Sequence, residues 1–182
     1  MAKALLFLAP GFEEIEALSI VDTLRRAGVD VVMVGLQKGT IEGAHGVPVI
    51  PDSAMDAITI EDFDAVILPG GNPGYVNLGK DPRVLDFATK AFETGKIVAA
   101  ICAAPSVLAK GGILNGKKAT IYPGKEADLI GAEYVNERVV VDGTVVTGQG
   151  PGTALEFGIK LVELLVGKQR AQELKVELVV NF

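Results

Sequence analysis

The sequence contains only one cysteine, Cys102, only one histidine, His45, and no tryptophan. A lone cysteine cannot form an intramolecular disulfide, and together with one histidine it cannot supply the four ligands of a structural zinc site. Walker and GxGxxG nucleotide-binding motifs are also missing. We therefore expect neither a metal nor a cofactor.

The chain also lacks long apolar runs and basic clusters. No apolar run approaches the roughly 20 residues that span a bilayer, and the N-terminal run is broken by Pro10-Gly11, unlike a signal peptide. The formal net charge of −6, with no run of Lys and Arg, opposes binding to nucleic acid phosphates. The sequence favours a cytoplasmic protein that binds neither membranes nor nucleic acids.

What is present indicates one α/β domain spanning residues 1–182, with 49% hydrophobic residues. Short apolar runs alternate with amphipathic segments, which is typical of a mainly parallel sheet covered by helices. The expected strands cover residues 4–9, 31–36, 64–68 and 96–101. The expected helices cover residues 13–27, 82–94, 103–110, 150–166 and 168–174. A hairpin is expected to pair residues 138–141 with residues 144–146 about Asp142-Gly143.

Three segments should meet at the carboxyl edge of this sheet, where ligands of open α/β sheets bind. They are residues 10–16, 69–74 and 102–105. Cys102 stands where a strand turns into a helix, and the N–H groups and dipole of a helix N-terminus can lower the pKa of a thiol. Cys102 is therefore a candidate nucleophile, although buried packing explains a cysteine in an apolar run equally well.

The other two segments carry glycines and acids. Gly70 and Gly71 permit a close approach of backbone N–H groups to an oxyanion, or simply form a turn. Glu13, Glu14 and Glu16 stabilise a first helical turn, or one of them faces Cys102 as a buried, protonated acid that shuttles a proton. The spacing does not choose among the three acids.

His45 follows the second expected strand in a peripheral segment. A Cys/His dyad needs the imidazole within hydrogen-bonding reach of the sulfur. We expect His45 to be a surface or interface residue.

Four segments taken together resemble the signature segments of a known family. They are Leu-Ala-Pro-Gly-Phe-Glu-Glu-Ile-Glu at 8–16, Leu-Pro-Gly-Gly at 68–71, Ala-Ala-Ile-Cys-Ala-Ala-Pro at 99–105 and Gly-Gln-Gly-Pro-Gly-Thr-Ala at 148–154. Their order and spacing are similar to the ThiJ/PfpI superfamily over essentially the whole chain. The resemblance is strongest to the branch of the human parkinsonism-linked deglycase and bacterial YajL.

The resemblance implies a flavodoxin-like three-layer sandwich with Cys102 in a strained nucleophile elbow and Glu16 as the protonated glutamate. It implies a homodimer. The resemblance also implies an anion pocket formed by the N–H groups of Gly70, Gly71 and Ala103. Tyr122 and Pro151 would be walls of this pocket. His45 and Arg26 would lie at the dimer interface. Tyr122 stands where some relatives carry a histidine, and tyrosine is a poor general base at neutral pH.

The activity implied is that of a glyoxalase III or deglycase acting on methylglyoxal, glyoxal or their early protein adducts. The alternative is a redox sensor or holdase chaperone that works through oxidation of Cys102. An intracellular cysteine peptidase is less favoured, because the peptidase branch has histidine where this sequence has Ala103.

Overall fold

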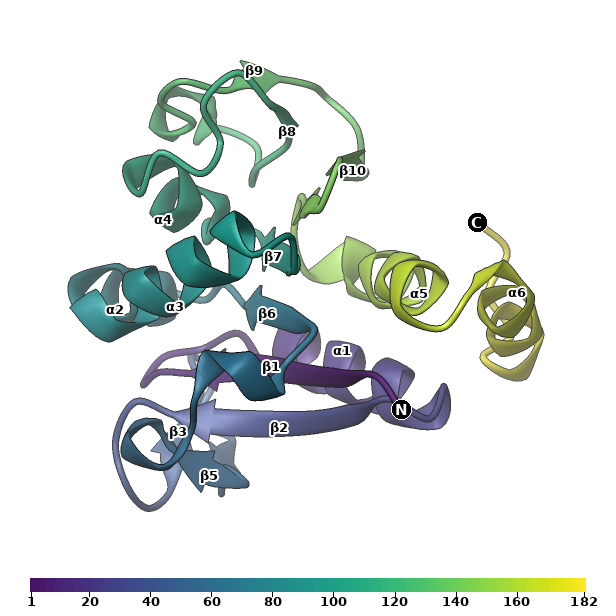
Figure 1. The fold of residues 1–182 in the computed structure, drawn as a ribbon, viewed down its shortest axis with the longest axis horizontal. Coiled ribbons are helices and arrows are strands. Elements are labelled where there is room, and N and C mark those ends of the chain that lie inside the picture. The colour runs from purple at the N-terminus through teal and green to yellow at the C-terminus, as the bar shows by residue number, and fades with distance from the viewer.

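The computed structural model describes residues 1–182, and its centre is a seven-stranded sheet (Figure 1). The strand order is β10-β11-β7-β6-β1-β2-β5. These strands are β1 (Lys3–Leu8), β2 (Asp30–Gly35), β5 (Ser53–Ala54), β6 (Ala65–Leu68), β7 (Ile97–Ile101), β10 (Val139–Asp142) and β11 (Val145–Gly148). All neighbours pair in parallel except β10 and β11. The mainly parallel sheet predicted from the sequence is confirmed.

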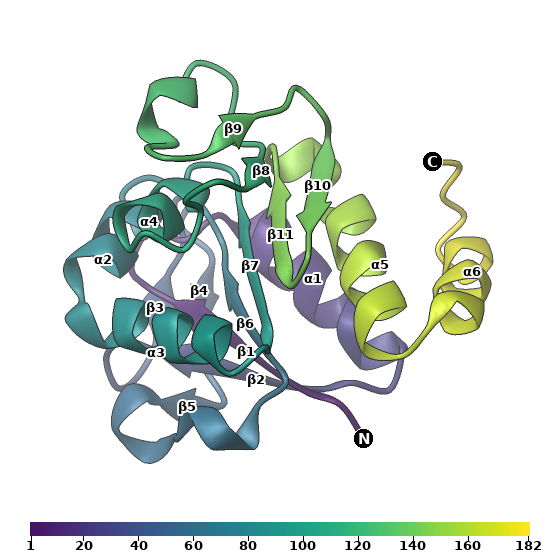
Figure 2. The same cartoon turned by 45° about the horizontal axis from the view of Figure 1, so that its top comes forward.

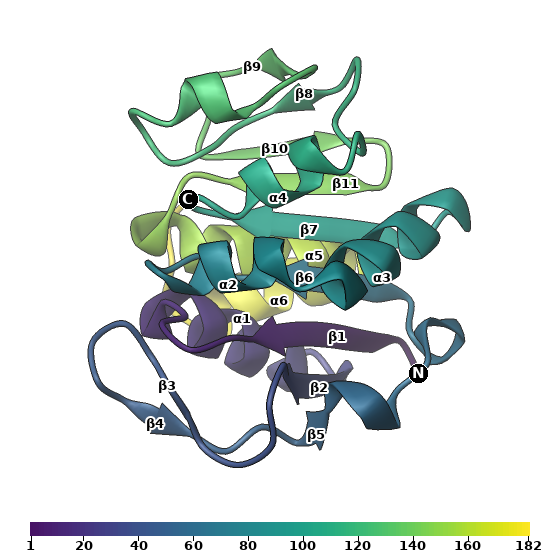
Figure 3. The same ribbon diagram turned by 90° about the vertical axis from the view of Figure 1, so that its left-hand side faces the viewer.

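Helices cover both faces of this sheet (Figures 2 and 3). They are α1 (Glu14–Arg26), α2 (Gly74–Lys80), α3 (Pro82–Glu93), α4 (Pro105–Lys110), α5 (Ala154–Leu165) and α6 (Lys168–Glu177). Helices α1 and α5 lie together on one face and α6 packs against α5, while α2, α3 and α4 lie on the other face. None of the helices combines the length and the apolar character that crossing a membrane would need.

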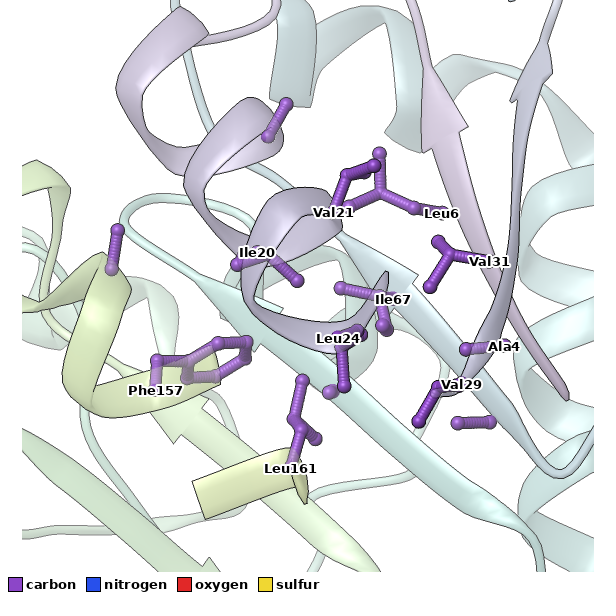
Figure 4. Packing of buried hydrophobic residues seen from close by; sticks show 14 of the residues in the cluster. Ala4, Leu6, Ile20, Val21, Leu24, Val29, Val31, Ile67, Phe157 and Leu161 are labelled. Carbon is purple, nitrogen blue, oxygen red and sulfur yellow. The ribbon is translucent and has the colours of Figure 1, made fainter. Parts of the chain in front are cut away.

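Strand β1 shows why a continuous apolar run produces three layers. Successive side chains of a strand point to opposite faces of the sheet. Leu6 and Leu8 join the core beneath α1 and α5, whereas Leu5 and Phe7 join the core beneath α3 and α4. Figure 4 shows the first of these cores, in which Leu6 and Ile67 of the sheet lie beside side chains of α1 and α5. Because both faces are buried, every position of the run must be apolar.

The helix boundaries differ from the expected ones around the carboxyl edge of the sheet. Helix α4 begins at Pro105 rather than at Ala103, and α5 begins at Ala154 after a 3₁₀ turn, Pro151–Thr153. Helix α2 was not predicted, because its seven residues include Gly74 and Gly79, which disfavour a helix. Two small sheets were also not predicted, and they pair β3 (Ile41–Glu42) with β4 (Pro48–Val49) and β8 (Lys118–Ala119) with β9 (Glu133–Tyr134).

Candidate active site

The three segments expected to converge do meet beyond the carboxyl ends of β1, β6 and β7. The Glu13 N–H donates to the Gly70 carbonyl at 3.0 Å, which joins the segment after β1 to the segment after β6. The Gly74 N–H donates to the Gly11 carbonyl, also at 3.0 Å. Gly70 in turn borders Cys102, since a Cβ added to this glycine would lie 2.5 Å from the Cys102 Cβ.

Cys102 is held in an unusual backbone conformation. Its φ of 63° lies in the left-handed region, which is rare for a residue with a side chain and costs about 1–3 kcal/mol. Hydrogen bonds fix both sides of this residue: its N–H donates to the Gly148 carbonyl and its carbonyl accepts from the Tyr122 N–H, each at 2.9 Å. This geometry is that of the strained elbow that the family resemblance implies, and it leaves the thiol half-buried.

Glu16 is the acid of α1 that faces Cys102. Its side chain is completely buried, one carboxyl oxygen, Oε2, accepts the Gly70 N–H at 2.7 Å, and Oε1 has no hydrogen-bond partner. Burial raises the pKa of Glu16 to about 7, although the Gly70 N–H and Cys102 act in the opposite direction. An acid with such a pKa can both accept and donate a proton at neutral pH.

Gly70 has a different role from the expected one. The Gly70 N–H donates to Glu16 Oε2, so the prediction that this N–H forms part of the anion pocket is wrong. Any larger residue would also push Cys102 and Glu16 apart, because an added Cβ would lie 2.8 Å from Glu16 Oε2. Gly70 therefore positions the acid beside the thiol.

Cys102 does not stand at the helix N-terminus that was expected to lower the pKa of its thiol, because α4 begins at Pro105. Burial, the negative charge of Glu16 and the hydrogen bond to Glu16 raise this pKa to about 12, and the N–H groups of Gly71 and Ala103 offset only part of the rise. The repulsion between the two groups disappears when Glu16 carries a proton. Cys102 and Glu16 consequently act as a coupled pair that keeps one proton between about pH 7 and pH 12.

The raised pKa of Glu16 makes folding stability depend on pH. In the folded state the carboxyl holds its proton up to about pH 7, against an ordinary value of 4.5, so the wild type loses stability as the pH rises from 4.5 to 7. We expect Glu16→Gln, which cannot ionise, to unfold several degrees higher than the wild type at pH 8, because the variant does not bear the cost of ionising a buried carboxyl. At pH 4 the two proteins should unfold together. Thermal unfolding followed by circular dichroism checks this, and a difference that is equal at both pH values would contradict it.

A cavity of about 230 Å³ opens onto the Cys102 thiol. The residues lining it are Gly71, Asn72, Tyr75, Cys102, Ala103, Tyr122 and Lys125. Tyr122 forms a partly exposed wall, and its ring lies beside Gly150, since a Cβ added there would lie 3.2 Å from Tyr122 Cδ2. Pro151, the next residue, does not line the cavity.

Three of these lining residues, Asn72, Tyr75 and Lys125, were not predicted as site residues, although Asn72 lies in the expected segment 69–74. Tyr75 belongs to the unpredicted helix α2, and Lys125 lies in the irregular segment after Tyr122. The only signal for Lys125 was its position three residues after Tyr122.

The other two acids lie beside His45 rather than beside the thiol. The Glu13 carboxylate accepts the Glu16 N–H at 2.7 Å and so caps the start of α1. Glu14 Oε2 lies 2.9 Å from His45 Nδ1, and Glu14 Oε1 accepts the His45 N–H at 2.7 Å. Burial alone would raise the pKa of Glu14, but these hydrogen bonds lower it overall, and the same contact raises the pKa of His45. Glu13, Glu14 and His45 have ligand atoms close enough for a metal ion, yet both Glu14 oxygens already have partners.

The two residues assigned to an interface lie at opposite ends of α1. His45 contacts Glu14 at the start of this helix, and its side chain is 72% exposed. Arg26 ends the helix, about 18 Å further along, and its Nε pairs with Asp22 at 2.7 Å. The structure does not bring these two residues together.

Comparison with known proteins agrees with this fold. The family model described as DJ-1/PfpI matches residues 2–164. The chain is 41% identical to the protein dj-1beta of Drosophila melanogaster over 99% of this chain and 98% of that protein, and 38% identical to a protein named deglycase from Pyrococcus horikoshii over 90% and 99%.

Two solved structures show the same fold over the full chain. That of Drosophila melanogaster DJ-1beta covers 100% of this chain and 99% of its own with a TM-score of 0.96 at 41% identity. Toxoplasma gondii DJ-1 in an oxidised form covers 100% of both chains with a TM-score of 0.96 at 35% identity. The chain therefore belongs to the DJ-1/PfpI family.

Proposed function

We propose that the protein is a cysteine-dependent glyoxalase that converts methylglyoxal or glyoxal into the corresponding hydroxy acid without a cofactor. The observation that carries this proposal is the coupled pair of Cys102 and Glu16 at a small cavity. The pair holds one proton above about pH 7, so the thiol can pass its proton to the Glu16 carboxylate as its sulfur attacks a carbonyl.

The reaction begins when the Cys102 sulfur forms a bond to the aldehyde carbon of methylglyoxal. The oxyanion that results is stabilised by the N–H groups of Gly71 and Ala103, which face the sulfur. The proton that Glu16 took from the thiol then neutralises this oxygen, which gives a hemithioacetal and returns Glu16 to its ionised form.

Glu16 next takes the proton from the former aldehyde carbon and returns it to the neighbouring carbon. The hydrogen of the hemithioacetal hydroxyl moves to the neighbouring oxygen, and the product is a thioester of lactate on Cys102. Water cleaves the thioester to release lactate and restore the thiol. The overall change is the addition of one water to methylglyoxal, so no external oxidant or reductant is required.

The size of the cavity favours free dicarbonyl compounds over large adducts. A volume of about 230 Å³ lies below the roughly 300–1,000 Å³ of pockets that enclose drug-sized ligands. Some relatives carry the name deglycase, and removal of early adducts from proteins is the second substrate class that we propose for the same pair.

The amount of lactate formed per protein molecule tests this proposal. We expect lactate to accumulate in large molar excess over the protein when methylglyoxal is supplied, because water regenerates the Cys102 thiol after each cycle. Loss of methylglyoxal alone is not sufficient, since thiols and amines capture it without turnover. Lactate that never exceeds the amount formed in buffer would overturn the proposal.

The second candidate function is a redox sensor or holdase. It is favoured by the N–H groups of Gly71 and Ala103, which would donate hydrogen bonds to the oxygens of an oxidised Cys102 as readily as to a substrate oxyanion. A wild type that forms no lactate, but takes up two oxygens on Cys102 under graded peroxide, would support this function instead. A peptidase is less favoured, because the only histidine pairs with Glu14.

We also propose that two copies of the chain associate through the exposed side of α1. Ile15 and Leu18 of α1 are exposed apolar residues, and so are Val47 and Ile50 of the neighbouring segment. Glu14 joins the two elements, because its Oε1 accepts N–H groups from this segment. The resulting apolar surface is of the kind that mediates contacts between proteins.

A further inference from the structure

Lys125 is the one lysine that lines the cavity in front of Cys102. The other lining residues have no permanent charge, and in the whole chain acids outnumber basic residues. The side chain of Lys125 is 35% exposed, so it both lines the cavity and is reached by solvent.

The contacts of Lys125 hold its ammonium at the cavity without neutralising it. Its Nζ donates to the Tyr75 hydroxyl at 3.2 Å and lies 5.1 Å from the centre of the Tyr75 ring. The carboxylate of Asp128 is 3.5 Å away and about half exposed, which is a weak ion pair. An ammonium has three N–H donors, and the structure supplies acceptors for only these two.

The nearby acids do not cancel this charge at the cavity. Glu126 accepts the Gly124 N–H at 2.9 Å and does not line the cavity. Glu16 is fully buried and does not line the cavity. Above about pH 7, Glu16 and Cys102 together hold one proton and one negative charge. Lys125 is therefore the only residue lining the cavity that carries a permanent charge, and that charge is positive.

We propose that Lys125 is a specificity-determining residue that recruits small carbonyl compounds carrying a carboxylate to Cys102, in preference to neutral ones. A single ammonium suits a single carboxylate, whereas a phosphate dianion is normally held by several donors. The carbonyl chemistry in this statement rests on the proposed function, but the preference for an anion is a property of the cavity itself.

Alkylation of Cys102 tests the preference without any turnover. Iodoacetate and iodoacetamide transfer groups of the same size to a thiolate, with iodide leaving in both cases, but only iodoacetate carries a carboxylate. Because the chain has one cysteine, mass spectrometry of the intact protein reports on Cys102 alone. The measured quantity is the ratio of the iodoacetate rate to the iodoacetamide rate, with the same ratio for the urea-unfolded chain as the reference.

We expect Lys125→Gln to lower this ratio about 5-fold at low ionic strength, with the iodoacetamide rate changed less than 2-fold, and the difference to shrink in 0.5 M salt. Lys90→Gln is the matched control: it removes the same charge from an exposed site on α3 that pairs with Asp86, and it should keep the wild-type ratio. Equal ratios for the wild type and Lys125→Gln would overturn the proposal. A fall that is as large in Lys90→Gln would also overturn it, because net charge would then explain the effect.

The outcome is independent of whether the protein makes lactate. If the wild type shows no turnover but Lys125→Gln still lowers the ratio, the glyoxalase proposal fails and the anion preference stands. If lactate forms and the ratio does not depend on Lys125, the glyoxalase proposal stands and the anion preference fails.

Discussion

Replacing Cys102 with serine is expected to abolish lactate formation from methylglyoxal, with a loss of at least roughly 10³-fold in kcat/KM. The substitution leaves a side chain of similar size at the same position, but a hydroxyl is far less acidic than a thiol. Without a sulfur nucleophile the covalent route has no first step. Initial rates of lactate release, measured with a lactate-specific assay, check this expectation.

The control for this variant is its fold, because Cys102 occupies a strained position with a φ of 63°. Serine also has a Cβ and must adopt the same conformation, so thermal unfolding of the variant should stay close to that of the wild type. A correctly folded Cys102→Ser that still forms lactate at the wild-type rate would show that the thiol does not carry the reaction.

Glu16→Gln is expected to lower kcat/KM by about 10²- to 10⁴-fold, which is the usual contribution of a general acid or base. Glutamine keeps the acceptor for the Gly70 N–H but cannot take a proton from the thiol or from carbon. The pH profile should change as well. In the wild type, kcat/KM should rise as the pH passes through about 7, since Glu16 must be ionised to accept the thiol proton, and this step should vanish in the variant.

Glu14→Gln is the matched control, because it neutralises a buried acid of the same helix that contacts His45 rather than Cys102. Its kcat/KM and its pH profile should stay near those of the wild type. If Glu16→Gln retained full activity, or lost it no more than Glu14→Gln does, the proton relay would have to be assigned to another group.

The apolar runs of the sequence were sufficient to predict a sheet covered by helices on both faces. They also predicted that the site lies at the carboxyl edge of this sheet. A run such as residues 4–9 is apolar at every position because both faces of the sheet are covered. The strands that end at Leu8, Leu68 and Ile101 then bring their following loops together at one edge.

The choice of Glu16 among the three acids depended on the family resemblance, because the helical period does not separate it from Glu13, which lies four residues before Ala17 and seven before Ile20. Glu16 lies four residues before Ile20 and eight before Leu24, and both of these face the core. Because residues at this spacing share one face of a helix, Glu16 points inward as well.

Other features of the site were beyond local sequence patterns, because they depend on contacts between distant segments. The pKa of Cys102 is governed by burial and by Glu16 rather than by the short helix α4. The N–H of Gly70 donates a hydrogen bond to the carboxyl of Glu16, which lies 54 positions earlier in the chain. Lys125 reaches the cavity through its contact with Tyr75, which is 50 positions away.

The enantiomeric composition of the lactate is the most direct test of the central claim that Cys102 and Glu16 together turn over methylglyoxal. Glu16 can return a proton from one side only, because it is buried on one side of the thiol, so the wild type should release a single enantiomer of lactate. Chiral chromatography of the product, with Cys102→Ser as the control, measures this. Racemic lactate, at a rate no greater than that of Cys102→Ser, would contradict the claim.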